Sequence, residues 1–364
     1  MRRFFWALFV LLDGLVLLAA ATGYAAVHVD PRTFWWSELL AVALPAFAVA
    51  LLVLTAVPVA MKRWGWVALH VVALVVLALR LVPFERLQQA GPAADDDLVV
   101  MTLNVPRFGP SAEQLAADVF DLLVAERPVF VGLQETVARH RTQPPYRPTI
   151  ASYVSPAVDS LGYLLAIPPD WVTHQPVLIR PDAPGGLVVV QQLQRTLETG
   201  PEDRGASQYV RTRFRWQGRE GVHYNVHLRY FGQEKPWEED VRLLQPGTWL
   251  PFVRRYREAY RRRAAEVEEI VREIEAETLP VIVAGDFNAT ANNWGYHRLA
   301  EGRTDAFAVA GSGWGGTYRA DFPVVRIDHV LVDPAWEVVE AHVPAVTFSD
   351  HRPLVVRLRW RDGG

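Results

Sequence analysis

VIVAGDFNAT (281–290), RIDHVLV (326–332) and FSDHRPLVV (348–356) are three stretches near the carboxyl-terminal end of a chain of 364 residues. Each joins an apolar run, typical of a β-strand, to polar side chains. Buried carboxylates are costly unless they are paired or bind a metal, so a core strand alone does not explain them. We interpret the three stretches as parts of one hydrolytic centre. Its polar residues are Asp286, Asn288, Asp328, Asp350 and His351.

Polar residues also end three apolar runs further up the chain, and each run predicts a buried strand. The ends of parallel strands meet at the carboxyl edge of a sheet, where a site is expected. The stretches at 326–332 and 348–356 carry their polar residues at the start instead, so antiparallel strands there would join the same edge. A mixed sheet with one functional edge satisfies the pattern. The upstream residues are Asn104 in 98–105, Glu135 in 129–135 and His227 in 222–228.

Two helices are predicted between these strands, at residues 111–126 and 251–277. The second helix is long and charged. Its Arg-rich half (RRYREAYRRR, 254–263) suggests phosphate binding, but it runs into the mixed-charge sequence EVEEIVREIEAE. Alternating charge is typical of a solvated helix face, which is the interpretation we favour. The pattern predicts one α/β domain over residues 98–361.

The apolar excess of the chain lies near its amino terminus, in the runs Phe4–Val27, Leu39–Met61 and Trp66–Val82. The first two exceed twenty residues and fit a bilayer core of about 30 Å, and the third is near the lower limit. A cleaved signal peptide is the alternative for the first run, but two further runs follow it. We therefore predict a membrane domain with three transmembrane helices at residues 1–85 and a linker at 86–97.

Three spans place the two ends of the chain on opposite sides of a membrane. The basic residues near the span ends give a weak preference for a cytoplasmic amino terminus. We therefore expect a multi-pass cell-membrane protein whose catalytic domain is extracytoplasmic. Asp13 and His70, in the first and third spans, can pair inside the bundle, where helix packing is favoured over a functional role. Arg2, Arg3, Lys62 and Arg63 lie on the predicted inner side, and Arg32, Arg80 and Arg86 on the outer.

The residue types of the site favour phosphoryl chemistry. The chain has no cysteine, which excludes thiolate metal sites and cysteine nucleophiles. Carboxylate and amide oxygens favour a hard cation, Mg²⁺ or Mn²⁺, which would also hold and polarise a substrate phosphate. His351 with Asp328 can form a general-base pair, and His227 can contact the phosphate or assist the leaving group. Motifs of nucleophile-elbow hydrolases, P-loop NTPases and Rossmann dehydrogenases are absent.

The ordered set TLNV, LQE, NVHL, GDFN, RIDHV and SDHRP resembles the endonuclease/exonuclease/phosphatase superfamily over residues 97–360. This superfamily includes DNase I-like and exonuclease III-like enzymes. The resemblance implies a four-layer α/β sandwich with two mixed β-sheets that hydrolyses phosphate esters with Mg²⁺. It also implies that Glu135 binds the metal with help from Asn104, and that Asp350 lies beside it.

The resemblance implies roles in proton transfer as well. His351, oriented by Asp328, would act as general base or face the phosphate. Asp286 and Asn288 would position the attacking water and the phosphoryl oxygens. His227 would stabilise the transition state or protonate the leaving group.

Two nearby polar residues and one segment are expected to be structural or variable. Asn225 suits a hydrogen-bonding role at a strand end, and His329 is expected to point away from its neighbour Asp328 and pack. The aromatic-rich segment 229–256 is either a lid, a membrane-contacting segment or a plain surface insertion.

The sequence favours a phosphorylated substrate at a membrane. From residue 91 onwards there are 30 Lys and Arg against 36 Asp and Glu, a net charge of −6. Nucleic-acid binders usually present a basic face, so nucleic acid is a less favoured substrate. We predict a membrane-anchored phosphoesterase acting on mono- or diesters, lipid-linked phosphates among them. The alternative is a surface-anchored endo- or exonuclease, and a binding protein with a dead site is disfavoured by the intact polar set. No protein partner follows from the sequence.

Overall fold

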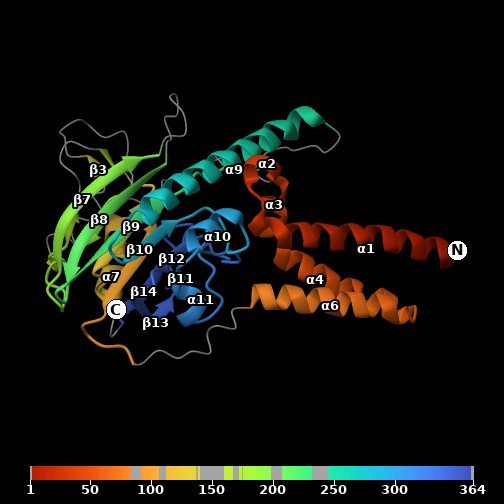
Figure 1. The fold of residues 1–364 in the computed structure, drawn as a ribbon, viewed down its shortest axis with the longest axis horizontal. Helices are drawn as coiled ribbons and strands as arrows, with labels where there is room; N and C mark the ends of the chain where they lie inside the picture. The colour runs from red at the N-terminus through yellow and green to blue at the C-terminus, as the bar shows by residue number, and fades with distance from the viewer. Residues whose placement is uncertain are drawn as a thin grey trace. The chain divides into compact units, whose positions relative to one another are not determined.

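The computed structural model describes residues 2–82, 92–105, 112–136, 138–139, 160–166, 172–173, 175–197, 207–231 and 245–361. The chain divides into two compact units. The first, which we call the helical unit, consists of Met1–Phe84, Tyr230–Ala264 and Thr290–His297. The second, the sheet unit, consists of Glu85–Arg229, Ala265–Ala289 and Arg298–Gly364. Figure 1 shows the elements of both.

The first sheet of the sheet unit has the strand order β13-β14-β1-β2-β6-β4. It is mixed, because β1 pairs in parallel with β2 and antiparallel with β14. β1 therefore brings its carboxyl end to the same edge as the amino end of β14. The strands are β1 (Leu98–Asn104), β2 (Phe130–Gln134), β4 (Leu164–Ala166), β6 (Val177–Ile179), β13 (Trp336–His342) and β14 (Leu354–Trp360).

The second sheet has the order β11-β12-β10-β9-β8-β7 and is mixed in the same way. Its central strand β10 is parallel to β9 and antiparallel to β12. A separate pair joins β3 (Ala138–Arg139) to β5 (Val172–Thr173). The strands of the second sheet are β7 (Val188–Thr196), β8 (Gln208–Trp216), β9 (Arg219–His227), β10 (Val281–Asp286), β11 (Thr304–Asp305) and β12 (Asp328–Val332).

The two sheets pack face to face across the main apolar core. Val100 of β1 and Ile282 of β10 belong to this core, whereas the alternate residue Met101 packs with α7 (Ala112–Glu126) on the outer face. Because β1 is buried on both faces, its sequence is an almost uninterrupted apolar run. The predicted α/β sandwich with two mixed sheets is confirmed.

The long charged helix begins earlier than its sequence suggests. α9 spans Pro246–Glu275, so it includes the last part of the segment 229–256, which the sequence leaves open as a lid, a membrane-contacting segment or a plain surface insertion. Pro251 lies inside this helix, and a proline more often marks a helix start, which is why the expected boundary fell there. Residues 232–244 of that segment lie outside the described residues. Two short helices follow, α10 (Trp294–Ala300) and α11 (Ala306–Ala310).

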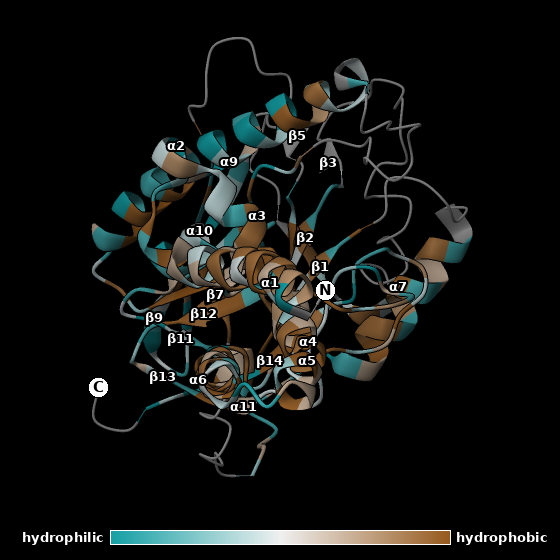
Figure 2. Ribbon diagram, turned by 90° about the vertical axis from the view of Figure 1, so that its right-hand side faces the viewer, coloured by the Kyte–Doolittle hydropathy of each residue, from teal (hydrophilic) through white to brown (hydrophobic). Residues whose placement is uncertain are grey.

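The amino-terminal part of the helical unit is built from apolar helices. Two of them are long and apolar enough to cross a membrane, Arg3–His28 and Trp64–Leu81. A third candidate consists of Trp36–Val42 and Leu44–Ala60, which are bent by 64° at their break. Figure 2 shows these helices as predominantly hydrophobic. They are α1 (Arg2–Ala25), α3 (Trp36–Val42), α4 (Leu44–Leu54), α5 (Ala56–Ala60) and α6 (Trp64–Leu81), with α2 (Pro31–Phe34) between α1 and α3.

A buried polar network joins these helices. His70 Nε2 lies 2.8 Å from Asp13 Oδ2, so the predicted pair is present. Trp66 Nε1 donates to the same carboxylate oxygen at 2.6 Å, and His70 Nδ1 lies 2.9 Å from Thr55 Oγ1. The network ties α1, α6 and the turn between α4 and α5 together. At the amino end of α1, Trp6 contacts Trp66 at 6.1 Å between ring centroids.

The opposite end of the helices contacts the segment Thr290–His297, which belongs to the same unit. Glu38 Oε2 accepts a hydrogen bond from Asn293 Nδ2 at 3.0 Å, and Glu38 Oε1 accepts one from Trp294 N at 3.0 Å. Arg80, near the end of α6, donates to Ala291 O at 3.1 Å. Glu38, which precedes the second apolar run, and Arg80, near the end of the third, therefore contact the same short segment.

Candidate active site

Asp286 lies at the carboxyl end of β10 and is held by two neighbours, Asn288 and Asn104. Its Oδ1 accepts the backbone N–H of Asn288 at 2.8 Å, and its Oδ2 accepts Asn104 Nδ2 at 3.0 Å. The preceding Gly285 has φ +146°, and a Cβ there would lie 1.8 Å from Val226 O. Only glycine lets β10 approach β9 so closely at this point. The GDFN motif therefore combines a close strand contact with a fixed carboxylate.

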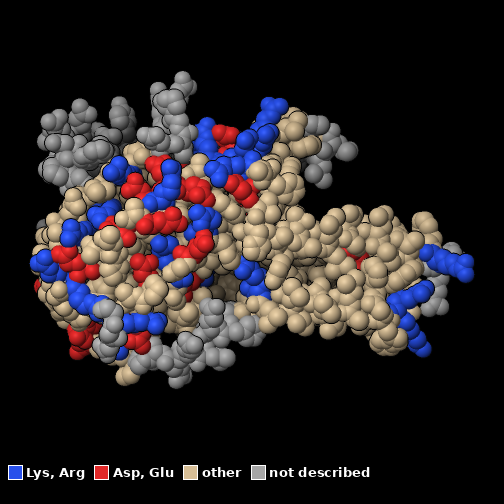
Figure 3. Space-filling model, in the orientation of Figure 1, with Lys and Arg blue, Asp and Glu red and all other residues tan. Residues whose placement is uncertain are grey.

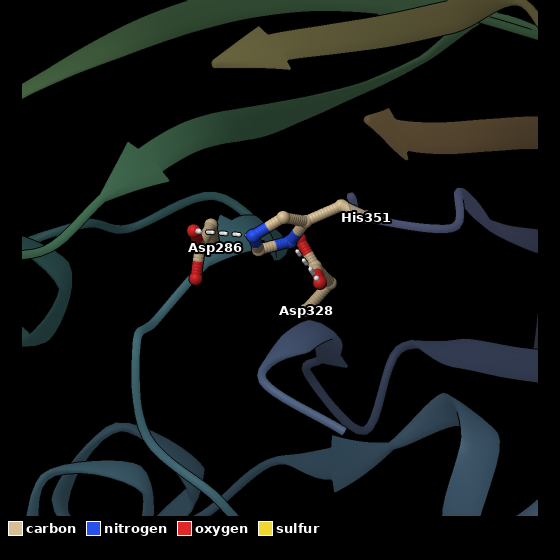
Figure 4. Close-up of side chains that lie close together, drawn as sticks. All are labelled: Asp286, Asp328 and His351. Carbon is tan, nitrogen blue, oxygen red and sulfur yellow. Dashed lines mark hydrogen bonds and ion pairs between the residues drawn. The ribbon is translucent and has the colours of Figure 1, made fainter. Parts of the chain in front are cut away.

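His351 and Asp328 form the predicted pair. His351 Nδ1 lies 2.9 Å from Asp328 Oδ2, and both side chains are buried. Asp328 begins β12 directly opposite Asp286 in the antiparallel register. His351 Nε2 then lies 3.9 Å from Asp286 Oδ2, as Figure 4 shows. The ligand atoms of these three residues all lie within 4.8 Å of one another.

His227 and Glu135 complete the same cluster. His227 Nε2 lies 3.7 Å from Asp286 Oδ2 and 3.9 Å from Glu135 Oε1. Glu135 follows β2 with φ +56°, and Asn288 follows β10 with φ +49°. A non-glycine residue in this conformation costs about 1–3 kcal/mol and is often found at functional sites. Two predicted site residues thus sit in strained turns directly after parallel strands.

The electrostatics of the cluster depend on burial and on close charges. Burial and the charge of Asp328 raise the pKa of Asp286, against the opposing effect of His351. Burial alone would lower the pKa of His351, but the charges of Asp328 and Asp286 outweigh it and raise the pKa to about 10. Without a bound cation or substrate, these residues therefore favour a protonated His351 at neutral pH.

The structure brings together seven of the eight residues predicted for the site: Asn104, Glu135, His227, Asp286, Asn288, Asp328 and His351. Asp350 is exposed, and within the described part of the chain its side chain makes no hydrogen bond or ion pair. Its charge still acts on the neighbouring His351.

The two polar residues expected to be structural are so. Asn225 is buried and accepts Gln134 Nε2 at 2.6 Å while its Nδ2 donates to Leu133 O at 3.1 Å. His329 is buried with Nε2 2.9 Å from Ala289 O, pointing away from its neighbour Asp328. Neither side chain joins the cluster.

Three supporting residues were missed by sequence reasoning. Thr317 Oγ1 accepts the backbone N–H of Asp328 at 3.2 Å, and the ring of Tyr318 lies 5.1 Å from that of His351. Ser349 Oγ donates to Asn104 O at 2.7 Å and accepts the N–H of His351 at 3.1 Å. Ser349 is the first residue of the SDHRP motif, so the motif could have pointed to it. Thr317 and Tyr318 lie in an irregular segment that contains no recognisable motif.

The donor atoms of the cluster fit a hard cation. Asn104 uses its Nδ2 to bind Asp286, and its side-chain amide oxygen Oδ1 accepts no hydrogen bond from any described residue. Asp328 Oδ1 is buried and likewise unbonded. Oxygen atoms from carboxylates and an amide are the ligands that Mg²⁺ and Mn²⁺ prefer. The residues present therefore suit such an ion better than a soft metal.

Comparison with known protein families gives one match, which covers most of the chain. A family model described as Endonuclease/Exonuclease/phosphatase family matches residues 101–351. A search of curated proteins found no match. The matched range includes every residue of the cluster described above.

Solved structures share the fold of this chain over nearly three quarters of its length. An endonuclease/exonuclease/phosphatase family protein from Bacteroides thetaiotaomicron is 15% identical, with a TM-score of 0.54 over 73% of this chain and 98% of that one. A mannosyl-6-phosphatase from Bacteroides thetaiotaomicron VPI-5482 is 16% identical, with a TM-score of 0.53 over 72% and 100%. D. rerio TDP2 complexed with a single strand DNA product is 15% identical, with a TM-score of 0.53 over 73% and 100%. At these identities the likeness concerns the fold alone.

Proposed function

The chain belongs to the endonuclease/exonuclease/phosphatase family, whose members hydrolyse phosphoesters, and on this premise we propose that it is a membrane-anchored, Mg²⁺-dependent phosphoesterase. The observation that carries the proposal is the approach of His351, held by Asp328 at 2.9 Å, to the buried carboxylate of Asp286. A structural ion pair would not need the additional presence of His227 at the same carboxylate, with Glu135 beside His227.

Glu135 and Asn104 are the residues we assign to the metal, and Asp350, which precedes His351 in the sequence, is assigned to a second ion. When bound, Mg²⁺ polarises the phosphoryl group and offsets the charge that develops on it. Mn²⁺ would fit the same oxygen ligands. The strained turn at Glu135 is consistent with this role, because it holds the carboxylate at the edge shared by both sheets.

The residues of the chain itself supply positioning and proton transfer. Asp286 and Asn288 position the attacking water. Asp328 holds Nδ1 of His351 and leaves Nε2 facing the reacting group. A neutral His351 ring takes the proton of the water, whereas a protonated ring binds a phosphoryl oxygen. His227 assists the leaving group.

Contacts within the helical unit support three membrane crossings. Glu38 lies in the first turn of α3, at the start of the bent pair of helices, and Arg80 lies near the end of α6, yet both contact the segment 290–297. The chain between Glu38 and Arg80 must therefore begin and end on the same side of the membrane. If α6 crosses the membrane, the bent pair must cross it as well. We further propose that the catalytic domain is extracytoplasmic, and a carboxyl-terminal reporter active only outside the cytoplasm tests this.

The favoured substrate is a lipid-linked phosphate ester at the bilayer surface. Membrane anchoring motivates this proposal, and the net charge of −6 from residue 91 onwards speaks against a general nuclease. A surface-anchored endo- or exonuclease is the second candidate, because structural relatives include a protein crystallised with single-stranded DNA.

The deciding experiment uses the full chain in detergent or lipid. Lipid pyrophosphate, sphingomyelin, plasmid DNA and a generic phosphodiester are offered with and without Mg²⁺, and Glu135→Ala serves as the matched variant with an impaired metal site. Hydrolysis of the lipid substrates that requires both Mg²⁺ and Glu135 supports the proposal. Cleavage of DNA alone would favour the nuclease, and no Mg²⁺-dependent hydrolysis of any substrate would refute the enzyme assignment.

A further inference from the structure

The first half of α9 is strongly basic in an otherwise acidic protein. Residues 246–263 contain six arginines and one glutamate, a net charge of +5. The rest of the chain from residue 91 onwards has 24 Lys and Arg against 35 Asp and Glu, a net charge of −11. Figure 3 shows basic side chains gathered along this helix. The segregation of charge is too strong to follow from the mixed-charge pattern of the helix as a whole.

Three of these arginines form an exposed stripe that has no acidic partner among the described residues. Arg254, Arg257 and Arg261 are spaced by three and four residues, so they lie on one face of the helix. All three are exposed and make no hydrogen bond or ion pair within the described residues. The one glutamate nearby, Glu258, is bound to Arg262 at 2.6 Å.

Arginines elsewhere are commonly paired. Arg298 lies 2.9 Å from Glu268 in the second half of α9, and Arg326 lies 2.8 Å from Asp305. The sequence-based interpretation of a solvated face with alternating charge thus fits the second half of α9. It does not fit the first half, where the stripe lacks such partners.

A neighbouring face of this half of α9 contacts the amino-terminal part of the helical unit. Tyr260 is buried and its ring lies 6.5 Å from that of Trp35, within the same compact unit. Trp35 belongs to the segment between the first two apolar stretches, where Phe34 is 46% and Trp36 is 45% exposed. Exposed aromatic side chains at the end of an apolar helix are typical of the headgroup level of a bilayer.

The stripe therefore lies close to the expected membrane surface. Arg257 and Arg261 are within one helical turn, about 5.4 Å, of Tyr260 along the helix axis. Cationic side chains at this level attract the negative headgroups of anionic lipids. A basic helix with aromatic residues on a neighbouring face is the composition expected of an interfacial helix.

We propose that Arg254, Arg257 and Arg261 bind the anionic phospholipid headgroups of the bilayer that the apolar helices cross. The inference rests on the membrane anchoring proposed above and not on the chemistry of the active site. Binding would hold the first half of α9 against the lipid surface, next to the segment that follows the GDFN motif in the same unit.

The absence of cysteine in the chain makes a direct test possible. Glu258→Cys places one fluorophore on the exposed face beside the stripe. The full protein is reconstituted into nanodiscs of zwitterionic lipid alone or with about 30 mol % phosphatidylglycerol, together with lipids that carry a nitroxide quencher on the headgroup. The ratio of quenched to unquenched label reports how often the stripe meets the lipid.

We expect strong quenching only in the anionic nanodiscs. The ratio should fall about fivefold for each of Arg254→Gln, Arg257→Gln and Arg261→Gln, and 1 M salt, which shortens the screening length to about 3 Å, should abolish it. The matched control carries Arg127→Gln, Arg195→Gln and Arg272→Gln, three exposed arginines of the sheet unit, and should behave like the parent.

Two outcomes would overturn the proposal. The first is equal quenching in zwitterionic and anionic nanodiscs. The second is equal quenching in the parent and in a variant that carries Arg254→Gln, Arg257→Gln and Arg261→Gln together. Loss of quenching when soluble glycerophosphate is added at the same phosphate concentration would show that the stripe binds a free anion, and it would also refute the proposal. Loss of the protein from the nanodiscs would instead contradict the anchoring, so the two failures remain distinguishable.

Discussion

Glu38 and Asn293 are 255 positions apart in the chain, yet the side-chain amide of Asn293 donates to the carboxylate of Glu38 at 3.0 Å. The second carboxylate oxygen accepts the N–H of Trp294 at 3.0 Å. Asn293 Oδ1 in turn accepts the N–H of Thr290 at 2.8 Å, two residues beyond Asn288 of the GDFN motif. A residue from the apolar amino-terminal region therefore fixes the loop by which the chain leaves the proposed active site.

Removing this carboxylate should impair both stability and catalysis. Glu38→Ala removes the acceptor of the Trp294 N–H, at a cost of about 1–3 kcal/mol, and leaves Asn293 Nδ2 only its bond to the backbone oxygen of residue 38. We expect a lower Tm and a lower kcat with a smaller change in KM, because the loop that carries Asn288 loses its support. Glu38→Gln keeps an acceptor oxygen and should recover part of both. Thermal unfolding and steady-state kinetics of the full chain measure this, with exposed Glu275→Ala as the control. An unchanged Tm in Glu38→Ala would show that the contact is dispensable.

The pair of His351 and Asp328 should be required for turnover. We expect His351→Gln to lower kcat by about 10²–10⁴, the usual contribution of a positioned acid or base. Asp328→Asn keeps the shape but no longer fixes the imidazole, so it should also lower kcat while leaving the fold intact. His342→Gln, outside the cluster, should keep parental kcat. Parental activity in His351→Gln would remove this residue from the mechanism.

Metal removal should abolish activity reversibly. After dialysis against a chelator, hydrolysis should be lost and then restored by Mg²⁺, because the oxygen donors of the cluster suit a hard cation. Glu135→Ala should raise the Mg²⁺ concentration needed for half-maximal activity by at least about tenfold. Glu337→Ala, on the half-buried strand β13, is the matched carboxylate control. Full activity in chelator would contradict the proposed metal dependence.

The sequence predicted the parts of the site that follow from strand ends. Asp286 and Asp328 end and begin apolar runs, and antiparallel pairing puts them directly opposite each other. Thr317 could not be predicted, because it reaches Asp328 from an irregular segment whose path no periodicity encodes. Glu38 was equally hidden, since nothing local links a residue among apolar helices to a loop far along the chain. The start of α9 was also predicted wrongly. Pro251 indicated a helix start at that residue, whereas the helix begins at Pro246 and includes Pro251 in its interior.

Gly285 should be intolerant of any side chain. In Gly285→Ala the new Cβ would meet Val226 O at 1.8 Å, and its φ of +146° is strained for alanine. Overpacking alone costs about 1–3 kcal/mol, and the backbone strain adds to it. Chemical denaturation should show this loss, together with reduced activity from displacement of Asp286. Gly247→Ala, where nothing lies within 4 Å of the new Cβ in helix α9, should be neutral or slightly stabilising. A parental free energy of unfolding in Gly285→Ala would show that the strands can move apart.

The contact between His342 and Glu126 should make stability depend on pH away from the active site. His342 Nε2 lies 2.9 Å from Glu126 Oε2, and this hydrogen bond raises the pKa of His342 despite its partial burial. Because the pKa is raised in the folded state, the stabilisation is complete below the ordinary value of 6.5 and is lost as the pH rises through the folded value. His342→Gln should therefore cost less than about 1 kcal/mol at pH values below 6.5, and nothing at alkaline pH. Glu126→Gln should remove the same pH dependence, since it deletes the partner. Denaturation curves across this range test the pair, and a cost that grows towards alkaline pH would contradict the assigned sign.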